Sequence, residues 1–498
     1  MSLTKLAYLL IVASLTVLIA FTTGCTPEYE VEVQADPEDV GKIEGEGIYE
    51  EGEDVTIEAE PEKGYEIVKW EKNGEEIDKK YIEFEIEENT EVVANFREII
   101  IPDDNLKEAI RNELEIEGKL TKEDLKDLKN LRARGENISS LEGLQHAKNL
   151  EDLDIRGNEV TDVATLESIN DLELRISLEQ LPDDLSVFED IDKLRVHTSK
   201  PEELYPLVEL KDDTKLSVNI SGEVEDISSL AELDNIVKLS ITSESGPGGQ
   251  LYDSIENFAP ISELKSLKEL EIHSYKIEDL GFLNLEDLQK LSLVKNDIKN
   301  IKPLRNLRDL EELTLGINPI ENINALAELD NLEELNLGGT EVTDVSALSE
   351  LDDLEVLQIS NSNISDLFPL KNLENLRVLS ANSNPISDIS PLSSLEELEE
   401  LDLGGTHVQD ITPLKGLSKL KVLNLDLWLK LSYPPELDYT IKDISPLLEL
   451  ENLEKLSLKS KLAEELEDDD KTEEIINEMK ERNVNIDYSF YSPLQEND

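Results

Sequence analysis

The most constraining feature of the sequence is a leucine that returns at a fixed interval. It stands 22 residues apart at Leu313, Leu335, Leu357, Leu379, Leu401 and Leu423. A period of this length is typical of a solenoid, in which each unit buries its apolar face against the next unit. With a more variable spacing the same unit extends back to Leu131, and its last copy begins at Leu456. The sequence therefore predicts fifteen coils.

The repeated unit contains a strand, a turn and the start of a short helical segment. The L-x-L segment predicts a strand with two inward side chains. Asn318 and Asn384 follow it, where a buried amide can satisfy backbone groups of the turn; Thr340, Ser362 and Thr406 replace that Asn. Ser390-Pro391, Thr412-Pro413 and Ser445-Pro446 predict an N-cap hydroxyl before a short helical piece. An aspartate recurs as well, and it suits either a structural loop bond, which we favour, or a calcium ladder: Asp344, Asp366, Asp388 and Asp410.

The 22-residue unit, with I-S-D-I-S-P-L at residues 386–392, resembles the internalin-type leucine-rich repeat. The resemblance implies an α/β leucine-rich-repeat solenoid at residues 131–460, with a parallel sheet on the concave face and short helical turns on the convex side. Residues 98–130 resemble the internalin-type N-terminal helical cap. Residues 461–498 predict a C-terminal cap, with an amphipathic helix from Thr472 to Arg482 and a final strand at residues 484–486.

In the segment before the repeats, apolar residues recur at every second position instead of in a 22-residue unit. Residues 25–97 alternate apolar and polar side chains, which predicts a small, mostly β domain, and Asn73-Gly74 predicts a hairpin turn. The pattern of glycines, apolar residues and Trp70 resembles the divergent internalin-type B repeat of bacterial surface proteins, which implies a spacer. Trp70 is either a ligand platform or, as we favour, a core residue.

The N-terminal segment, residues 1–24, has the layout of a secretory signal. Lys5 precedes an apolar run from Leu6 to Phe21, and the segment ends at Gly24, directly before Cys25. This resembles a bacterial lipoprotein signal, although Thr22 replaces the usual apolar residue. The resemblance implies cleavage before Cys25, lipidation of Cys25 and export to the cell envelope. The alternative is an ordinary signal peptide with a chance cysteine.

Charge and composition exclude several classes of function. The chain carries 47 Lys and Arg against 115 Asp and Glu, a net charge of −68. Such a balance argues against nucleic-acid binding, which needs clustered cations. The single cysteine and the four histidines, which lie in different coils, predict no metal site, no cofactor and no catalytic constellation.

One pattern opposes the global charge. Scarce basic residues gather on the exposed positions of the N-terminal strands, where they either neutralise Asp152, Asp154 and Glu173 or bind an acidic partner. These residues form the basic column: Arg132, Arg134, Arg156, Arg175, Arg195, His197, Lys215 and Lys238. We add Trp428, in an insertion that the repeat does not need, as a further candidate binding residue.

Together these patterns predict a non-enzymatic protein. We expect an exported, lipid-anchored leucine-rich-repeat protein that mediates protein–protein interaction or adhesion at the cell envelope. It would face outward, act as a monomer and meet the membrane through the lipid on Cys25. The alternative is an envelope scaffold without a specific ligand.

Overall fold

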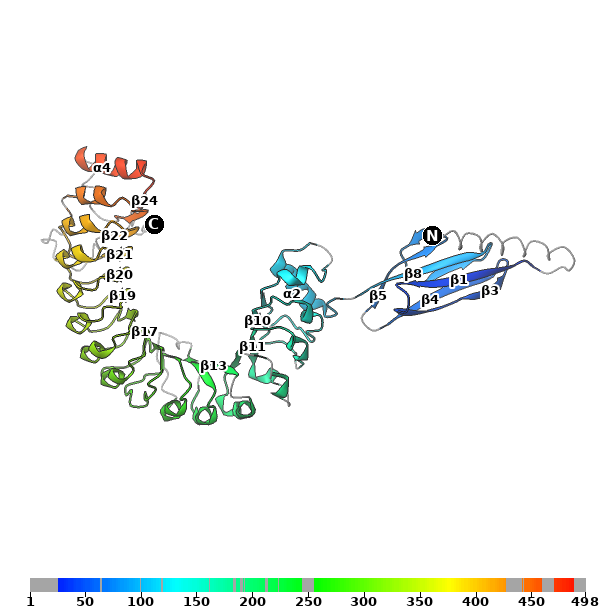
Figure 1. The fold of residues 1–498 in the computed structure, drawn as a ribbon, viewed down its shortest axis with the longest axis horizontal. Helices are drawn as coiled ribbons and strands as arrows, with labels where there is room; N and C mark the ends of the chain where they lie inside the picture. The colour runs from blue at the N-terminus through cyan, green and yellow to red at the C-terminus, as the bar shows by residue number, and fades with distance from the viewer. Residues whose placement is uncertain are drawn as a thin grey trace, which may run out of the picture. The chain divides into compact units, whose positions relative to one another are not determined.

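The computed structural model describes residues 26–62, 65–98, 100–117, 120–160, 162–181, 185–188, 191, 193–210, 214–222, 224–243, 255–426, 441, 443–458 and 470–487. The chain divides into two compact units, and Figure 1 traces both from the blue N-terminal end to the red C-terminal end. The first unit holds a β domain and the N-terminal cap. The second holds the repeats from residue 151 onward together with Arg132–Gly135.

The β domain contains two sheets built from eight described strands. Strands β3, β1, β8, β5 and β6 form one sheet in that order, and β2, β4 and β7 form the other. Strand β1 pairs in parallel with β8, whereas the remaining pairs are antiparallel. The bounds are β1 (Glu28–Asp36), β2 (Gly41–Glu44), β3 (Gly47–Glu50), β4 (Asp54–Pro61), β5 (Tyr65–Lys72), β6 (Glu75–Ile77), β7 (Ile82–Glu85) and β8 (Thr90–Glu98).

Trp70 lies in the core of this domain. Its side chain is fully buried, and its indole N–H donates to the carbonyl of Lys79 at 3.1 Å. Burial of so large a side chain supplies the bulk that a small aliphatic core lacks. The core interpretation of Trp70 is therefore confirmed. The predicted hairpin is also present, since β5 and β6 pair on either side of Asn73 and Gly74, both with positive φ.

A helix caps the N-terminal end of the repeats, as predicted. Helix α2 (Asp104–Leu114) buries Leu106 and Ile110, and Asp103 accepts hydrogen bonds from the backbone of Asn105 and Leu106 at its N-terminus. The second carboxyl oxygen of Asp103 accepts from Ser139, from both its backbone and its hydroxyl. One carboxylate thus joins the helix start to the turn after the first repeat strand.

The repeats form one parallel sheet of sixteen strands in the described part of the chain, in sequence order. Most neighbouring strands align their first leucines, for example Leu357 with Leu379, whereas β13 and β14 do not. The bounds are β9 (Asn130–Arg132), β10 (Asp152–Asp154), β11 (Glu173–Ser177), β12 (Lys193–Thr198), β13 (Lys215–Ser221), β14 (Ile236–Thr242), β15 (Glu269–His273), β16 (Lys290–Ser292), β17 (Glu312–Thr314), β18 (Glu334–Asn336), β19 (Val356–Gln358), β20 (Val378–Ser380), β21 (Glu400–Asp402), β22 (Val422–Asn424), β23 (Lys455–Ser457) and β24 (Asn485–Asp487).

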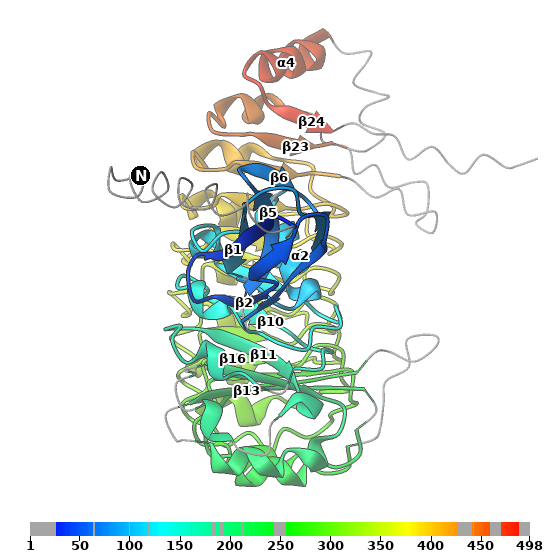
Figure 2. The same cartoon turned by 90° about the vertical axis from the view of Figure 1, so that its right-hand side faces the viewer.

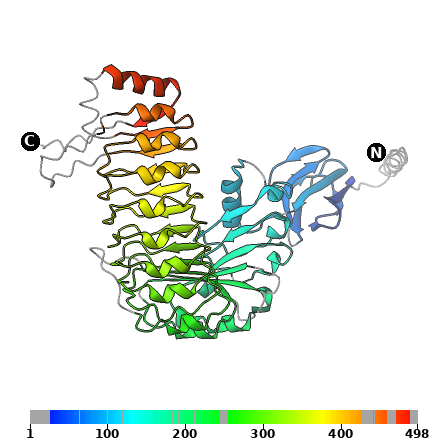
Figure 3. The same ribbon diagram turned by 60° about the vertical axis from the view of Figure 1, so that its left-hand side comes forward.

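The helical turns of the second unit lie on the opposite side of its coils from the strands (Figures 1 and 3). They are 3-10 helices, and the regular ones are η10 (Lys302–Asn306), η11 (Asn324–Glu328), η12 (Ser346–Leu348), η13 (Phe368–Leu370), η14 (Ser390–Ser394), η15 (Thr412–Gly416) and η16 (Ser445–Glu449). Between the two sides the repeated leucines are buried, with Leu357 and Leu379 at 0% exposure. The predicted leucine-rich-repeat solenoid with a preceding β domain is confirmed.

Buried amides and hydroxyls close several of the coils, including the predicted ones at Asn318, Asn384, Thr340 and Thr406. The amide of Asn318 donates to the carbonyls of Leu293 and Leu315, both at 2.8 Å, and so ties one coil to the previous one. Asn384 repeats this arrangement with Ile359 and Ala381. In the coil of Thr340 a hydroxyl takes over part of the role by donating to its own coil.

The start of each helical turn corrects one expectation. The hydroxyls of Ser390, Thr412 and Ser445 do not cap their 3-10 helices. Instead, the carboxylate two residues earlier accepts the backbone N–H, as in Asp388 with Ser390 at 2.8 Å. The hydroxyl prediction was wrong because Ser390 is already the first residue of its 3-10 helix, and its hydroxyl bonds to the carboxylate of Asp388 instead of to a later backbone N–H. The structural interpretation of the recurring aspartates is confirmed at Asp344, Asp366, Asp388 and Asp410.

The C-terminal end carries the predicted helix and strand. Helix α4 (Asp470–Glu481) buries Ile475, Ile476 and Met479, and β24 continues the sheet beside β23. Figure 2 shows β23, β24 and α4 in succession at the red end. The apolar face of α4 thereby covers the last coil, which would otherwise expose its core.

Candidate functional site

The basic column lies on the strand face of β9 to β14 and in the turns that directly follow β9 and β10. Side chains alternate along a strand, so the residues between the buried ones face away from the core. Arg175 and Arg195 are direct cross-strand partners on β11 and β12. Lys193 and Lys215 are partners on β12 and β13. The sheet thus brings together basic residues that belong to separate repeats of the sequence.

Three arginines of the basic column are bound by carboxylates of the same sheet. Arg156 forms a bidentate pair with Asp154, two residues before it, through Nε and Nη2. Arg175 contacts Asp152 at 2.5 Å and Glu173 at 3.1 Å. Arg195 contacts the same oxygen of Glu173 at 2.9 Å. For these three residues the structure supports neutralisation by neighbouring carboxylates.

The Asp154 carboxylate shows how strongly these pairs act. The side chain is buried, and burial alone would raise its pKa. The hydrogen bonds from the side chain and the backbone of Arg156 outweigh that effect and hold the pKa of Asp154 below its ordinary value. Asp154 therefore stays ionised and fixes the guanidinium of Arg156.

His197 lies against Arg156. The Nη1 atom of Arg156 is 3.1 Å from Nδ1 of His197, which is on β12, two strands away from β10. Burial first, and then the positive charge of Arg156, lower the pKa of His197 to about 4. At neutral pH the ring is thus an uncharged acceptor, and it adds no charge to the basic column.

The register of β14 corrects the expected position of Lys238. The sequence placed Lys193, Lys215 and Lys238 in one column. A register shift between Leu216 and Ser217 instead pairs Lys238 with Ser217. Lys238 then reaches the carboxylates of Glu269 at 2.6 Å and Glu271 at 3.3 Å. Lys238 therefore lies beside Ser217, two residues further along the strand direction than Lys193 and Lys215.

Four cations of the strand face are exposed. They are Arg132, Arg134, Lys193 and Lys215, and no carboxylate among the described residues forms an ion pair with any of them. The chain as a whole carries a net charge of −68. They are the basic residues of this face that remain open to a partner.

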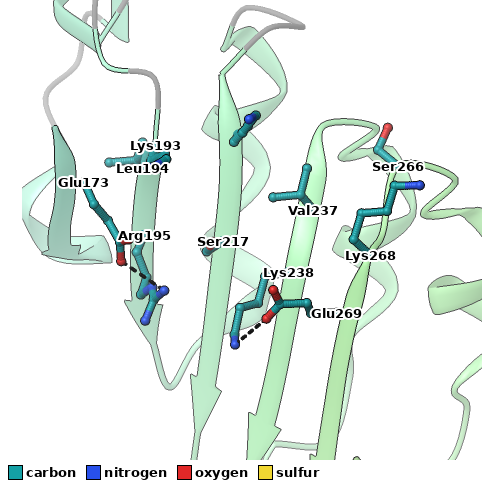
Figure 4. Close-up of a pocket in the computed structure, with 11 residues that line it drawn as sticks. Glu173, Lys193, Leu194, Arg195, Ser217, Val237, Lys238, Ser266, Lys268 and Glu269 are labelled. Carbon is teal, nitrogen blue, oxygen red and sulfur yellow. Dashed lines mark hydrogen bonds and ion pairs between the residues drawn. The ribbon is translucent and has the colours of Figure 1, made fainter. Parts of the chain in front are cut away.

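A hollow of about 590 Å³ lies on the same face. We call it the basic hollow, and Figure 4 shows Arg195 directed toward Glu173, and Lys238 toward Glu269, within it. Sequence reasoning missed Val237 and Lys268. Val237 lies at the register shift of β14, and the backbone N–H of Lys268, directly before β15, donates to its carbonyl at 2.8 Å. The lining of the basic hollow consists of Glu173, Lys193, Leu194, Arg195, Lys215, Ser217, Val237, Lys238, Ser266, Lys268 and Glu269.

Two predicted site residues, Cys25 and Trp428, lie outside the described residues. Among the residues that the structure describes, no cluster of three or more His, Cys, Asp or Glu is placed to hold a metal ion. Within the same part of the chain, none of the helices combines the length and apolarity that crossing a bilayer requires.

Two family models match parts of the chain. Residues 30–100 match the divergent InlB B-repeat domain, and residues 286–328 and 374–416 match leucine-rich repeats in two copies. No curated protein matches the chain.

Solved structures with similar folds include repeat proteins from two bacteria. An internalin (inlF) from Listeria monocytogenes is 28% identical, with 72% of this chain and 95% of that chain covered and a TM-score of 0.44. A leucine-rich-repeat protein from Leptospira interrogans is 19% identical, covering 74% and 97%, with a TM-score of 0.46. The functional domain of InlJ from Listeria monocytogenes is 16% identical, covering 72% and 74%, with a TM-score of 0.42.

The sheet, the buried leucines and the matched repeats define the class of this protein. It is a leucine-rich-repeat protein with a divergent B-repeat-type β domain at its N-terminal side.

Proposed function

We propose that this chain is an exported, lipid-anchored protein that binds a protein partner with the strand face of its N-terminal repeats. The observation that carries the proposal is the exposure of Arg132, Lys193 and Lys215 on one sheet, and of Arg134 in the turn after β9, in a strongly acidic chain. Arginine offers two parallel hydrogen bonds to a carboxylate, which suits recognition of acidic surfaces. Internalin-like architecture supports a role in protein–protein interaction or adhesion, although fold alone does not fix function.

The proposed location follows from the N-terminal segment up to Cys25. Lys5, the apolar run and Gly24-Cys25 match the order of a lipoprotein signal. Lipidation of Cys25 would hold the β domain and the repeats at the cell envelope, because two acyl chains anchor a protein stably. The match of residues 30–100 to a B-repeat model supports a spacer role for the β domain.

Affinity capture with the full chain tests the binding role. The test variant carries Arg132→Glu and Arg134→Glu, which reverse two exposed charges on the strand face. The control variant carries Arg305→Glu and Arg308→Glu, whose side chains both contact Glu328 near the helical turns. We expect an envelope protein that is retained by the parent and the control but lost with the test variant.

Two results would argue against the proposal. Equal retention by all three proteins would place the binding site elsewhere. Self-association or cell-wall attachment without a captured protein would favour the scaffold role instead.

A further inference from the structure

The basic hollow contains more positive than negative groups, and its carboxylates are already occupied. Its five cations are Lys193, Arg195, Lys215, Lys238 and Lys268, against Glu173 and Glu269. Glu173 is shared by Arg175 and Arg195, and Glu269 binds Lys238 at 2.6 Å. Any further anionic group in the hollow would therefore meet cations rather than competing carboxylates.

Lys193 and Lys215 create the strongest local imbalance. They are direct cross-strand partners on β12 and β13, about 4.8 Å apart along the sheet. Like charges in such positions repel each other and destabilise the pair. Both are exposed, and no described carboxylate forms an ion pair with either. A negative group placed between them would remove this repulsion.

The register shift of β14 shapes the hollow. It places the small side chain of Ser217 between Arg195 and Lys238, which are two strand spacings apart, roughly 10 Å. In the register that the leucine spacing predicts, with Leu239 beside Leu216, Lys238 would stand beside Lys215 and extend one straight lysine row. Bulges and register irregularities often redirect a side chain at a functional site. Here the irregularity places Arg195 and Lys238 on opposite sides of Ser217, so the cations surround the hollow instead of forming one row.

We infer that the basic hollow binds an extended acidic segment of the protein partner, with carboxylates at alternate positions. This inference rests on the proposed function and names the chemistry of the partner. Lys193 and Arg195 are two residues apart on β12, about 6.6 Å, which equals the spacing of alternate side chains in an extended peptide. Arg195 can take part although Glu173 binds it, because that ion pair uses Nη2 and the Nε of Arg195 has no hydrogen-bond partner among the described residues. Carboxylate is also the group that Arg195 and Lys238 already bind at the edges of the hollow.

The direct test titrates the full chain with a synthetic ten-residue peptide of alternating Glu and Ser. A peptide of alternating Gln and Ser and a sample of inorganic polyphosphate are the comparison ligands. We expect the Glu peptide to bind, the Gln peptide not to bind, and the affinity for the Glu peptide to fall as salt rises. Binding of polyphosphate more tightly than the Glu peptide would overturn the assignment to a peptide.

Variants locate the interaction. Lys193→Gln with Lys215→Gln should weaken the Glu peptide at least tenfold, whereas Lys215→Arg, which keeps the charge, should preserve the affinity. The matched control is Lys415→Gln with Lys419→Gln, since these lysines bind Glu449 and Glu397 outside the hollow. A double variant at Lys193 and Lys215 that keeps parental affinity would overturn the inference.

Two further measurements distinguish failure of this inference from failure of the proposed protein-binding function. The melting temperature of the Lys193/Lys215 variant should equal or exceed that of the parent, because a repulsion has been removed. The captured partner should be lost with this variant as well as with the Arg132/Arg134 variant. If only the Arg132/Arg134 variant loses the partner, the proposed function stands and the basic hollow is not the site.

Discussion

The Nη1 atom of Arg156 lies 3.1 Å from both ring nitrogens of His197, so the guanidinium can donate to the nitrogen of the neutral ring that carries no proton. The same guanidinium forms a bidentate pair with Asp154. Arg156 thereby links a residue of β10 to a residue of β12. This link makes the stability of the N-terminal repeats dependent on pH.

The pH dependence has a definite sign. The pKa of His197 falls from 6.5 to about 4 in the folded chain, because of burial and the nearby positive charge of Arg156; Arg195 and Arg134 add to the effect and Asp154 opposes it. Between these values the unfolded chain binds a proton that the folded chain does not. Stability should therefore fall as pH drops from 6.5 to 4, by up to about 1.4 kcal/mol per pH unit, less the effect of solvent screening.

Chemical denaturation at several pH values measures this slope. His197→Gln keeps an acceptor but cannot titrate, so its slope between pH 6.5 and 4 should be smaller than that of the parent. Asp154, whose lowered pKa has the same sign of effect, loses its contribution only at lower pH. Identical slopes for parent and variant would contradict the buried, neutral state of His197.

The buried leucines should not tolerate polar replacement. Leu357 is at 0% exposure, so Leu357→Asn would bury an unpaired amide and open a cavity. We expect a loss of about 3–5 kcal/mol, seen as a lower melting temperature. Glu334→Gln, at an exposed position of β18, is the control and should change little. A melting temperature within a degree of the parent would be inconsistent with the register of the sheet.

Ile317 occupies a position that suits glycine. Its φ is +56°, a left-handed conformation that is costly for a β-branched residue, and its side chain is 58% exposed. The corresponding residue one coil later is Gly339, also with positive φ. Ile317→Gly should raise the free energy of unfolding by about 1 kcal/mol. Gly339→Ile should lower it, and calorimetry on both variants tests the pair.

The buried amide of Asn318 should contribute more than a hydroxyl. It donates to three carbonyls, while its oxygen accepts from the backbone of Asn296 and Ile298. Asn318→Ala should cost about 2–4 kcal/mol, because several buried backbone groups lose their partner. Asn318→Thr should cost less, since Thr340 shows that a hydroxyl can keep one bond. Equal losses for both variants would show that these hydrogen bonds are not the source of the effect.

The lipid anchor can be tested by cell fractionation. Cys25→Ser removes the only thiol of the chain and should move the protein from the membrane fraction to the soluble fraction. Ser2→Ala, in the same signal segment, is the control and should leave partitioning unchanged. Membrane association that survives Cys25→Ser would exclude this lipidation.

The fold was largely predictable, because one apolar position per coil repeats with a fixed period. The register between β13 and β14, which pairs Leu239 with Val218, was not predictable. Strands β13 and β14 both alternate apolar residues, as in Leu216, Val218 and Ile220, and a slide of two residues keeps the same faces inward. An apolar pattern therefore cannot distinguish the two registers. The sequence likewise could not show that Asp388, rather than Ser390, caps its helical turn.

The position of the candidate site was predictable, but the ion pairs between its arginines and the neighbouring carboxylates were not. The strand spacing placed Arg156, Arg175 and Arg195 on one face. Which carboxylate each would bind depends on side-chain conformations across strands, and Glu173 serves two arginines at once. The separation of bound arginines from the exposed Lys193 and Lys215 therefore emerged only from the structure.

The connection between β22 and β23 is longer than the 22-residue repeat, yet Leu423 still pairs directly with Leu456. The sheet thus sets its own geometry independently of the length of chain between two strands. Loop-closure entropy grows only slowly with length, so such a connection tolerates additional residues at small cost. Residues added between Asp426 and Ile441 should therefore leave the pairing of Leu423 with Leu456 intact, so this connection is a permissive place for inserted peptides.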